Sequence, residues 1–171
     1  MQKKISAMRL GGAVLGKIKT QLEQFVRVGI TFEAIEKEAQ KLIKQAGMKP
    51  SFSTVPGYNW ATCVMKNHEV CHGIPIGKTV LEGDLITIDI GLINEGYHLD
   101  TSFTFPVGTV SKEVKEFLAT GKESLENAIQ AARIGNSVYD ISLAMEKPLL
   151  KKGYGVVFQL TGHGVGEQLH M

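Results

Sequence analysis

Apolar residues recur at helical spacing over the first part of the chain. From about Ser6 to Val28 they stand three and four positions apart, with lysines and a glutamate between them. Gly29 is the expected stop of this helix, and Thr31 is the expected N-cap of a second one. Gly47 and Pro50 end the second helix. The pattern therefore predicts a pair of helices at the start of the fold.

The middle of the chain has the composition and alternation of strands. After a loop-rich stretch that contains Pro56 and Gly57, short strands are predicted at Thr62–Met65 and Glu69–Cys71. A long hairpin follows over Leu85–Phe103, and Pro106 closes it. The change from helical to strand periodicity predicts an α+β fold.

The last third returns to helical spacing. Ser111 opens a third helix, and Ser137 with Asp140 resembles a capping box at the start of a fourth. Pro148 is expected to kink or end that helix, and Tyr154–Leu160 reads as a final apolar strand. The order of elements suggests an internal structural repeat that is not visible as residue identity.

Composition narrows the function classes. The 171 residues suffice for one domain, 43% are hydrophobic, and the net charge is only +2, so neither direct nucleic-acid binding nor membrane binding is expected. The two cysteines, Cys63 and Cys71, show neither a zinc-finger nor a disulfide pattern. A cytoplasmic protein without signal peptide or membrane span fits these features best.

Two aspartates within the apolar hairpin are the strongest chemical signal. A loop of Asn94-Glu95 would place Asp89 directly opposite Asp100. A three-residue loop with Gly96 as a bulge would shift the pairing by one, and a second bulge at Gly91 would restore the phase. In either case we expect both carboxylates on one face, where a cation between them would offset their repulsion. The alternative is that both are surface acids near a turn.

Two further clusters contain histidine. His72 lies between Cys71 and Gly73 at a predicted strand-to-turn junction, where it is either a functional group or an imidazole bonded to backbone at the edge of the core. Cys71 is expected to be an inert buried thiol. His163 lies between two glycines, which allow close approach to a ligand, and a neutral imidazole can bind a metal.

Taken in order, these clusters resemble methionine aminopeptidases of the short, bacterial-type class. The matching residues are Tyr58, Cys63, Cys71-His72-Gly73-Ile74-Pro75, Asp89-Ile90-Gly91, Gly96-Tyr97-His98-Leu99-Asp100-Thr101-Ser102 and Thr161-Gly162-His163-Gly164-Val165-Gly166. The resemblance implies the pita-bread fold, a mostly antiparallel sheet with covering helices. It also implies removal of the initiator methionine from nascent proteins by a metal-dependent hydrolase.

The resemblance assigns roles to individual residues. Two divalent ions (cobalt, manganese, iron or zinc) are implied, with Asp89 as a bidentate ligand, Asp100 as the bridging carboxylate and His163 as an imidazole ligand. His72 and His170 match two catalytic histidines that contact the substrate. Tyr58, Cys63 and Leu169 match positions that line the methionine pocket.

The same resemblance implies that the chain is a piece of a longer domain. Two glutamate ligands of the family lie beyond the Gly-His-Gly motif, and Glu167 matches neither. We expect one pita-bread domain over residues 1–171, with a first half of about 1–108 and the start of a second half at about 109–171. Whether the chain as it stands is active is left open.

Two alternative functions remain at this point. A proline-specific peptidase would share the Asp-Asp-His arrangement, and a non-catalytic binding module would keep the fold without the metal. The partner that the resemblance implies is the N-terminal methionine of peptides and nascent chains, bound by a monomeric protein. Proximity to the ribosome is left open.

Overall fold

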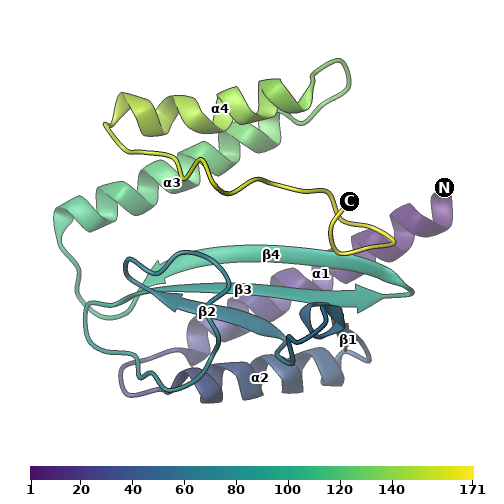
Figure 1. The fold of residues 1–171 in the computed structure, drawn as a ribbon, viewed down its shortest axis with the longest axis horizontal. Helices are drawn as coiled ribbons and strands as arrows, with labels where there is room; N and C mark the ends of the chain where they lie inside the picture. The colour runs from purple at the N-terminus through teal and green to yellow at the C-terminus, as the bar shows by residue number, and fades with distance from the viewer. The chain divides into compact units, whose positions relative to one another are not determined.

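The computed structural model describes all 171 residues and divides them into two compact units. The first unit comprises Met1–Thr109 and His163–Met171, and the second comprises Val110–Gly162. The first unit contains α1 (Gln2–Phe25), α2 (Phe32–Gln45), β1 (Lys49–Pro50), a short 3-10 helix η1 (Phe52–Thr54), β2 (Thr62–Lys66), β3 (Leu85–Asn94) and β4 (Tyr97–Pro106). The second contains α3 (Lys112–Ala131) and α4 (Val138–Lys151) (Figure 1).

Strand β3 is the centre of an antiparallel sheet and pairs with each of the other three strands. It pairs with β4 over its whole length, with β2 through residues 86–90, and with β1 at residues 92–93. The predicted strand Thr62–Met65 and the long hairpin are therefore confirmed. This sheet carries the candidate site described below.

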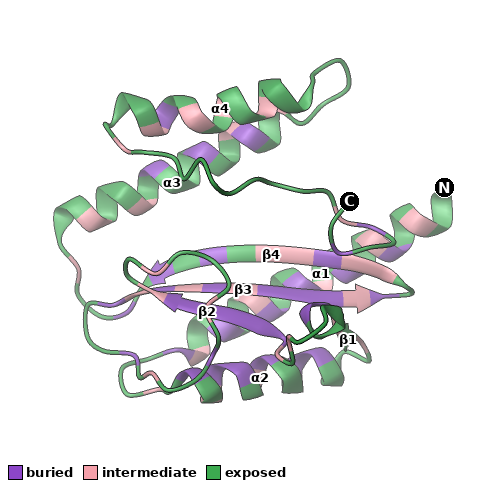
Figure 2. Cartoon of the chain, in the orientation of Figure 1, coloured by how far each residue is buried: buried purple, intermediate pink, exposed green.

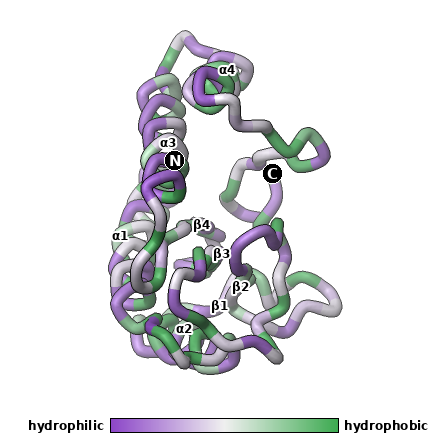
Figure 3. The backbone as a smooth tube through the Cα atoms, turned by 90° about the vertical axis from the view of Figure 1, so that its left-hand side faces the viewer, coloured by the Kyte–Doolittle hydropathy of each residue, from purple (hydrophilic) through white to green (hydrophobic).

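The core lies between one face of the sheet and the first two helices. Alternate side chains of β3 are fully buried there, namely Ile86, Ile88, Ile90 and Leu92. They pack with apolar residues of α1 and α2, which lie on the same side of the strands in Figures 1 and 3 and carry their buried positions toward the sheet in Figure 2. Removing apolar surface from water in this way is the main stabilising contribution to the unit.

The predicted helix starts are confirmed by their caps. Thr31 accepts a hydrogen bond from the Ala34 N–H at the start of α2, and Ser111 caps α3 in the same way. Ser137 and Asp140 form both arms of a capping box at α4. Helix α1 begins at Gln2 rather than Ser6 and ends at Phe25, because Val26 adopts an extended conformation.

Two predicted strands do not form, and one predicted helix end lies elsewhere. Glu69–Cys71 is not a strand but part of the loop between β2 and β3. Helix α4 does not end at Pro148 but continues to Lys151; the proline falls in the last turn, where its missing hydrogen bond disturbs few others. Tyr154–Leu160 forms no strand, because an extended segment needs a partner strand and this one pairs with none.

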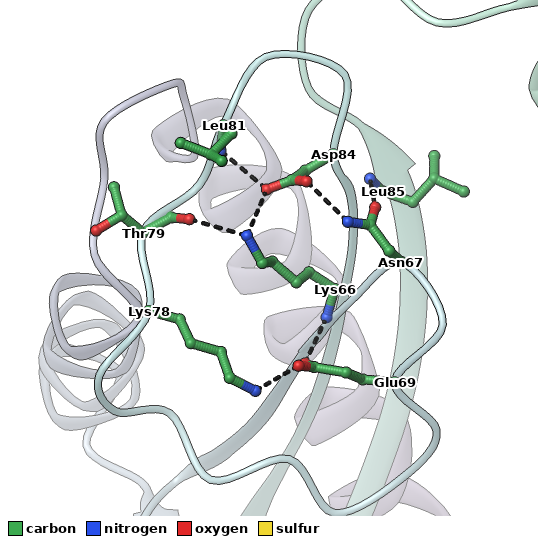
Figure 4. A network of polar contacts seen from close by, with 8 residues as sticks. All are labelled: Lys66, Asn67, Glu69, Lys78, Thr79, Leu81, Asp84 and Leu85. Carbon is green, nitrogen blue, oxygen red and sulfur yellow. Dashed lines mark hydrogen bonds and ion pairs between the residues drawn. The ribbon is translucent and has the colours of Figure 1, made fainter.

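The loop between β2 and β3 is closed at its base by a polar network (Figure 4). Asp84, only 7% exposed, accepts hydrogen bonds from Lys66 Nζ (3.1 Å), Asn67 Nδ2 (2.8 Å) and the Leu81 N–H (2.9 Å). Burial alone would raise the pKa of Asp84, but the hydrogen bonds from Asn67, Leu81 and Lys66 outweigh it and lower that pKa. The loop that carries His72 is thus tied down where it leaves the sheet.

The second unit is the helical pair α3 and α4 with the segment that follows. Ser124 Oγ on α3 donates to the Met145 carbonyl on α4 at 2.6 Å. Phe117 and Tyr154 pack edge to face, with ring centroids 5.1 Å apart.

No helix of the chain combines the length and the apolar character that crossing a membrane requires.

Candidate functional site

The hairpin turn decides how the two aspartates meet. The loop is Glu95-Gly96, both with positive φ (49° and 85°), which is the backbone of a tight two-residue turn. Neither predicted loop is correct, because the turn lies one residue beyond Asn94-Glu95 and the strands run without a bulge. Asp89 therefore lies opposite Ser102, and Asp100 lies opposite Gly91.

This register keeps both carboxylates on one face. Directly paired residues share a face, and so do residues two apart on one strand, so Asp89, Gly91 and Asp100 point to the same side. The shared face is the one that faces away from α1 and α2, since the alternate residues of β3 fill the core. The prediction that the carboxylates share a face is confirmed, although they meet diagonally rather than directly.

Gly91 has a packing role rather than the predicted bulge. A Cβ atom at this position would lie 2.7 Å from Phe52 Cε1 and 2.9 Å from Ser51 Cβ, closer than real side chains approach. The absence of a side chain therefore lets the segment before and within η1 lie directly over β3, next to the aspartates.

The two carboxyl groups strongly affect each other. Burial, the charge of Asp100 and a hydrogen bond between the two groups together raise the pKa of Asp89 to about 8, and burial contributes most. Asp100 Oδ1 is buried and has no hydrogen-bond partner. A buried oxygen without a donor beside a second carboxylate is a fitting environment for a cation.

Two histidines of the terminal segment lie beside this pair. His163 Nε2 is 3.6 Å from Asp100 Oδ2, and the ring of His170 packs edge-on against His163 with centroids 4.6 Å apart. The His163 side chain is 31% exposed. Asp100 thus neighbours both Asp89 and His163, but no three histidine, cysteine or acidic side chains converge closely enough to hold a metal ion by themselves.

An apolar cluster adjoins the aspartates on the same face. Cys63 of β2 pairs with Asp89 of β3, so the two side chains lie side by side. The cluster, which we call the apolar pocket cluster, consists of Phe52, Cys63, Met65, Leu169 and the partly buried Tyr58. The structure therefore brings together all three predicted pocket residues and adds two that the sequence analysis did not name.

Tyr58 and Cys63 form the polar edge of this cluster. Tyr58 Oη donates to the Thr62 carbonyl at 2.7 Å and contacts Cys63 Sγ at 3.2 Å. Burial raises the pKa of Tyr58, and burial raises the pKa of Cys63 to about 11. Cys63 is therefore a neutral thiol near neutral pH, an apolar contact rather than a nucleophile.

No hydrogen bond links the His72 side chain to these groups. Its side chain is exposed and makes no hydrogen bond, so the interpretation as a backbone-bonded imidazole at the core edge is wrong. Cys71 is also exposed, contrary to the expected buried thiol. The loop is nevertheless anchored here, because Val64 N–H donates to the Gly73 carbonyl at 2.9 Å and a side chain on Gly73 would collide with the Val64 carbonyl.

The roles of Met65, Phe52 and His98 were not predicted from the sequence. Met65 stands two residues after Cys63 on a predicted strand, so strand alternation could have identified it. Phe52 lies in a loop segment with no pattern that indicates its contacts. His98 accompanies Asp100 in the matched motif, but its contact with Ser51 joins residues far apart in the sequence.

Known proteins resemble this chain over nearly its whole length. Residues 6–171 match the metallopeptidase family M24. The chain belongs to that family. It is 34% identical over 168 residues to methionine aminopeptidase 1 of Bacillus subtilis, covering 98% of this chain and 68% of that protein. The predicted family is thereby confirmed.

Solved structures support the same fold for this M24 chain. A methionine aminopeptidase from Thermotoga maritima superposes with a TM-score of 0.96 at 30% identity, over 100% of this chain and 69% of that one. A prolidase from Pyrococcus furiosus superposes with a TM-score of 0.88 over 99% of this chain and 49% of that one; at 23% identity it shows the fold alone. The predicted α+β pita-bread fold is confirmed, and the chain spans about two thirds of its methionine aminopeptidase relatives.

Proposed function

We propose that this M24 chain is a metal-dependent aminopeptidase that acts on the N-terminal methionine of peptides and nascent proteins. The observation that carries the proposal is a partly buried carboxylate pair beside an apolar cluster on one face of the sheet. Similarity to a curated methionine aminopeptidase over 98% of the chain supports the same activity.

Asp89, Asp100 and His163 are the proposed residues that would hold a divalent metal. The carboxylate pair suits a cation because Asp100 Oδ1 is buried without a partner, and because burial and the charge of Asp100 raise the pKa of Asp89, which a cation would offset. Carboxylate and imidazole donors suit manganese, iron, cobalt or zinc without selecting one. The chemistry that a bound metal pair supplies is polarisation of the scissile carbonyl and activation of a water molecule.

The apolar pocket cluster is the proposed contact surface for the methionine side chain. Tyr58, Cys63 and Leu169 supply aromatic, thiol and aliphatic surface, and Phe52 and Met65 extend it. A flexible thioether packs favourably against such surfaces, aromatic rings included. Because Cys63 pairs with Asp89, a side chain held here would place the adjoining peptide bond near the carboxylates.

His72 and His170 are the proposed catalytic histidines. His170 adjoins His163, so its imidazole is close to the proposed ligands. His72 lies on the anchored loop after β2, where its exposed ring is free to meet a peptide. Each imidazole can donate a hydrogen bond to a substrate oxygen as negative charge develops on it.

We also propose that the protein works as a monomer in the cytoplasm, since both cysteines are free thiols, as a reducing compartment favours. The resemblance implies five ligands, and this chain contributes three of them. Metal binding is therefore the first property to measure, and peptide hydrolysis the second.

The test is a manganese titration of the wild-type chain and of Asp100→Asn. Changes outside the ligand set already cost about 10- to 100-fold in metal affinity, so loss of a ligand should cost more than about 100-fold. Glu95→Gln, an exposed acid in the turn of the same hairpin, is the matched control and should bind as the wild type does. A wild-type chain that binds no manganese, or an Asp100→Asn variant that binds equally well, would refute the metal site.

A substrate panel then separates the alternatives. With manganese or cobalt added, release of methionine from a Met-Gly-Met peptide supports the proposal. Hydrolysis of Xaa-Pro peptides alone would indicate a proline-specific peptidase. Metal binding without hydrolysis of either peptide would show that the three ligands of this chain bind metal but do not support peptidase activity.

A further inference from the structure

Ser51 is a buried serine next to the candidate site. It is 0% exposed, and its N–H donates to the Gly91 carbonyl at 2.9 Å, which prolongs the pairing of β1 with β3. Gly91 has no side chain and so leaves the space in which Ser51 lies. A Cβ atom added to Gly91 would be only 2.9 Å from the Ser51 Cβ. Ser51 therefore lies on the face that carries the aspartates.

His98 on β4 joins this residue to the terminal segment. Its ring Nδ1 lies 2.7 Å from Ser51 Oγ, while its backbone N–H donates to the Gly166 carbonyl at 2.6 Å. His98 is two residues before Asp100 on the same strand and so shares its face. One residue thus contacts the β1–η1 connection with its side chain and the terminal segment with its main chain.

The terminal segment 163–171 has few other attachments to the first unit. It is folded on itself by two hydrogen bonds between Gly164 and Met171. Besides the bond from His98, it is held by the 3.6 Å contact of His163 with Asp100 and by the burial of Leu169 in the apolar pocket cluster.

The main-chain bond from His98 reaches Gly166, three residues after His163 in the same segment. His170 of that segment contacts His163, and His163 contacts Asp100. The residue whose ring Ser51 contacts therefore also holds the segment that brings His163 to Asp100.

We propose that Ser51 and His98 are positioning residues whose hydrogen bond holds segment 163–171 so that His163 lies against Asp100. Neither residue is a proposed ligand. The inference rests on the proposed function in that His163 is a metal ligand, but the geometry it describes exists in the metal-free protein.

The first test compares manganese affinity in Ser51→Ala and His98→Phe with that of the wild type. Loss of a hydrogen bond that orients a ligand from outside should weaken binding by about 10-fold. Ser53→Ala is the matched control, because Ser53 is exposed and its hydroxyl contacts only the Pro50 carbonyl. Unchanged affinity in both variants, in a wild-type background that binds manganese, overturns the inference and leaves the proposed function intact.

The second test needs no metal. In imidazole NMR spectra of the metal-free chain, Ser51→Ala should shift the signals of His98, His170 and His163, while those of the exposed His68 and His72 stay in place. Ser53→Ala should shift none of them. If only the His98 signal moves, the inference fails whatever the manganese affinity. If the wild type binds no manganese, the proposed function fails and this spectrum alone decides the inference.

Discussion

Single residues on the outer face of the sheet decide what can lie next to the aspartates. Gly91 is the clearest case, because it is opposite Asp100, two residues from Asp89, and covered by Ser51 and Phe52. Its role is to leave room, and the same space then allows the Ser51 hydroxyl to reach His98.

Gly91→Ala should destabilise the protein by about 1–3 kcal/mol, because the added methyl group would lie 2.7 Å from the Phe52 ring and must displace it. The free energy of unfolding in urea measures this. Gly16→Ala is the control: Gly16 lies in α1 with nothing within 4 Å of the added Cβ, so it should stabilise by up to about 1 kcal/mol. Equal stability of the wild type and Gly91→Ala would contradict the close approach described above.

At the scale of elements, a buried carboxylate connects α2 to the strand that carries Cys63. Glu36 is 5% exposed and accepts hydrogen bonds from the Ala61 N–H (2.7 Å), the Thr62 N–H (3.0 Å) and Thr62 Oγ (2.5 Å). Gln40 Nε2 donates to the same group at 2.6 Å. The start of β2 is thereby held against α2, one residue before Cys63.

Glu36→Ala should lower the free energy of unfolding by about 3 kcal/mol, because two buried N–H groups and a hydroxyl would lose their acceptor. Chemical denaturation followed by circular dichroism measures the loss. Glu38→Ala, in the same helix, removes only an ion pair with the well-exposed Lys41, and should change stability by less than about 1 kcal/mol. Similar losses in the two variants would show that the Glu36 contacts contribute little.

At the scale of the whole molecule, the base of the β2–β3 loop should make stability depend on acid. The folded-state pKa of Asp84 lies below its ordinary value of 3.8, so its contribution is present above 3.8 and is lost as pH falls through the lower folded value. The difference in unfolding free energy between the wild type and Asp84→Asn should therefore be constant near neutral pH and shrink below 3.8. A difference that grows as the pH falls would contradict this sign.

The family relationship also belongs to this scale. The chain matches the M24 family over residues 6–171 and spans 68% of the length of its Bacillus subtilis relative. The structure describes the fold of each unit and the placement of the aspartates in the first unit. The metal and peptide experiments test the proposed ligands and catalytic histidines.

Local signals in the sequence were sufficient where the physics is local. Caps at Thr31, Ser111 and Ser137 involve residues three apart, and the inward and outward positions of β3 follow from strand geometry alone. The same alternation places Asp89 outside the core whatever its partner strand. These features were predictable because each depends on neighbours along the chain.

Tertiary structure decided everything that depends on contact between distant segments. No local pattern specifies the partners on which three features depend. These features are the turn at Glu95-Gly96, the absence of a strand at 154–160 and the contact of Ser51 with His98. The sequence by itself determined which residues could bear the chemistry. Only folding, by pairing strands and excluding water from one face, determined which of them meet.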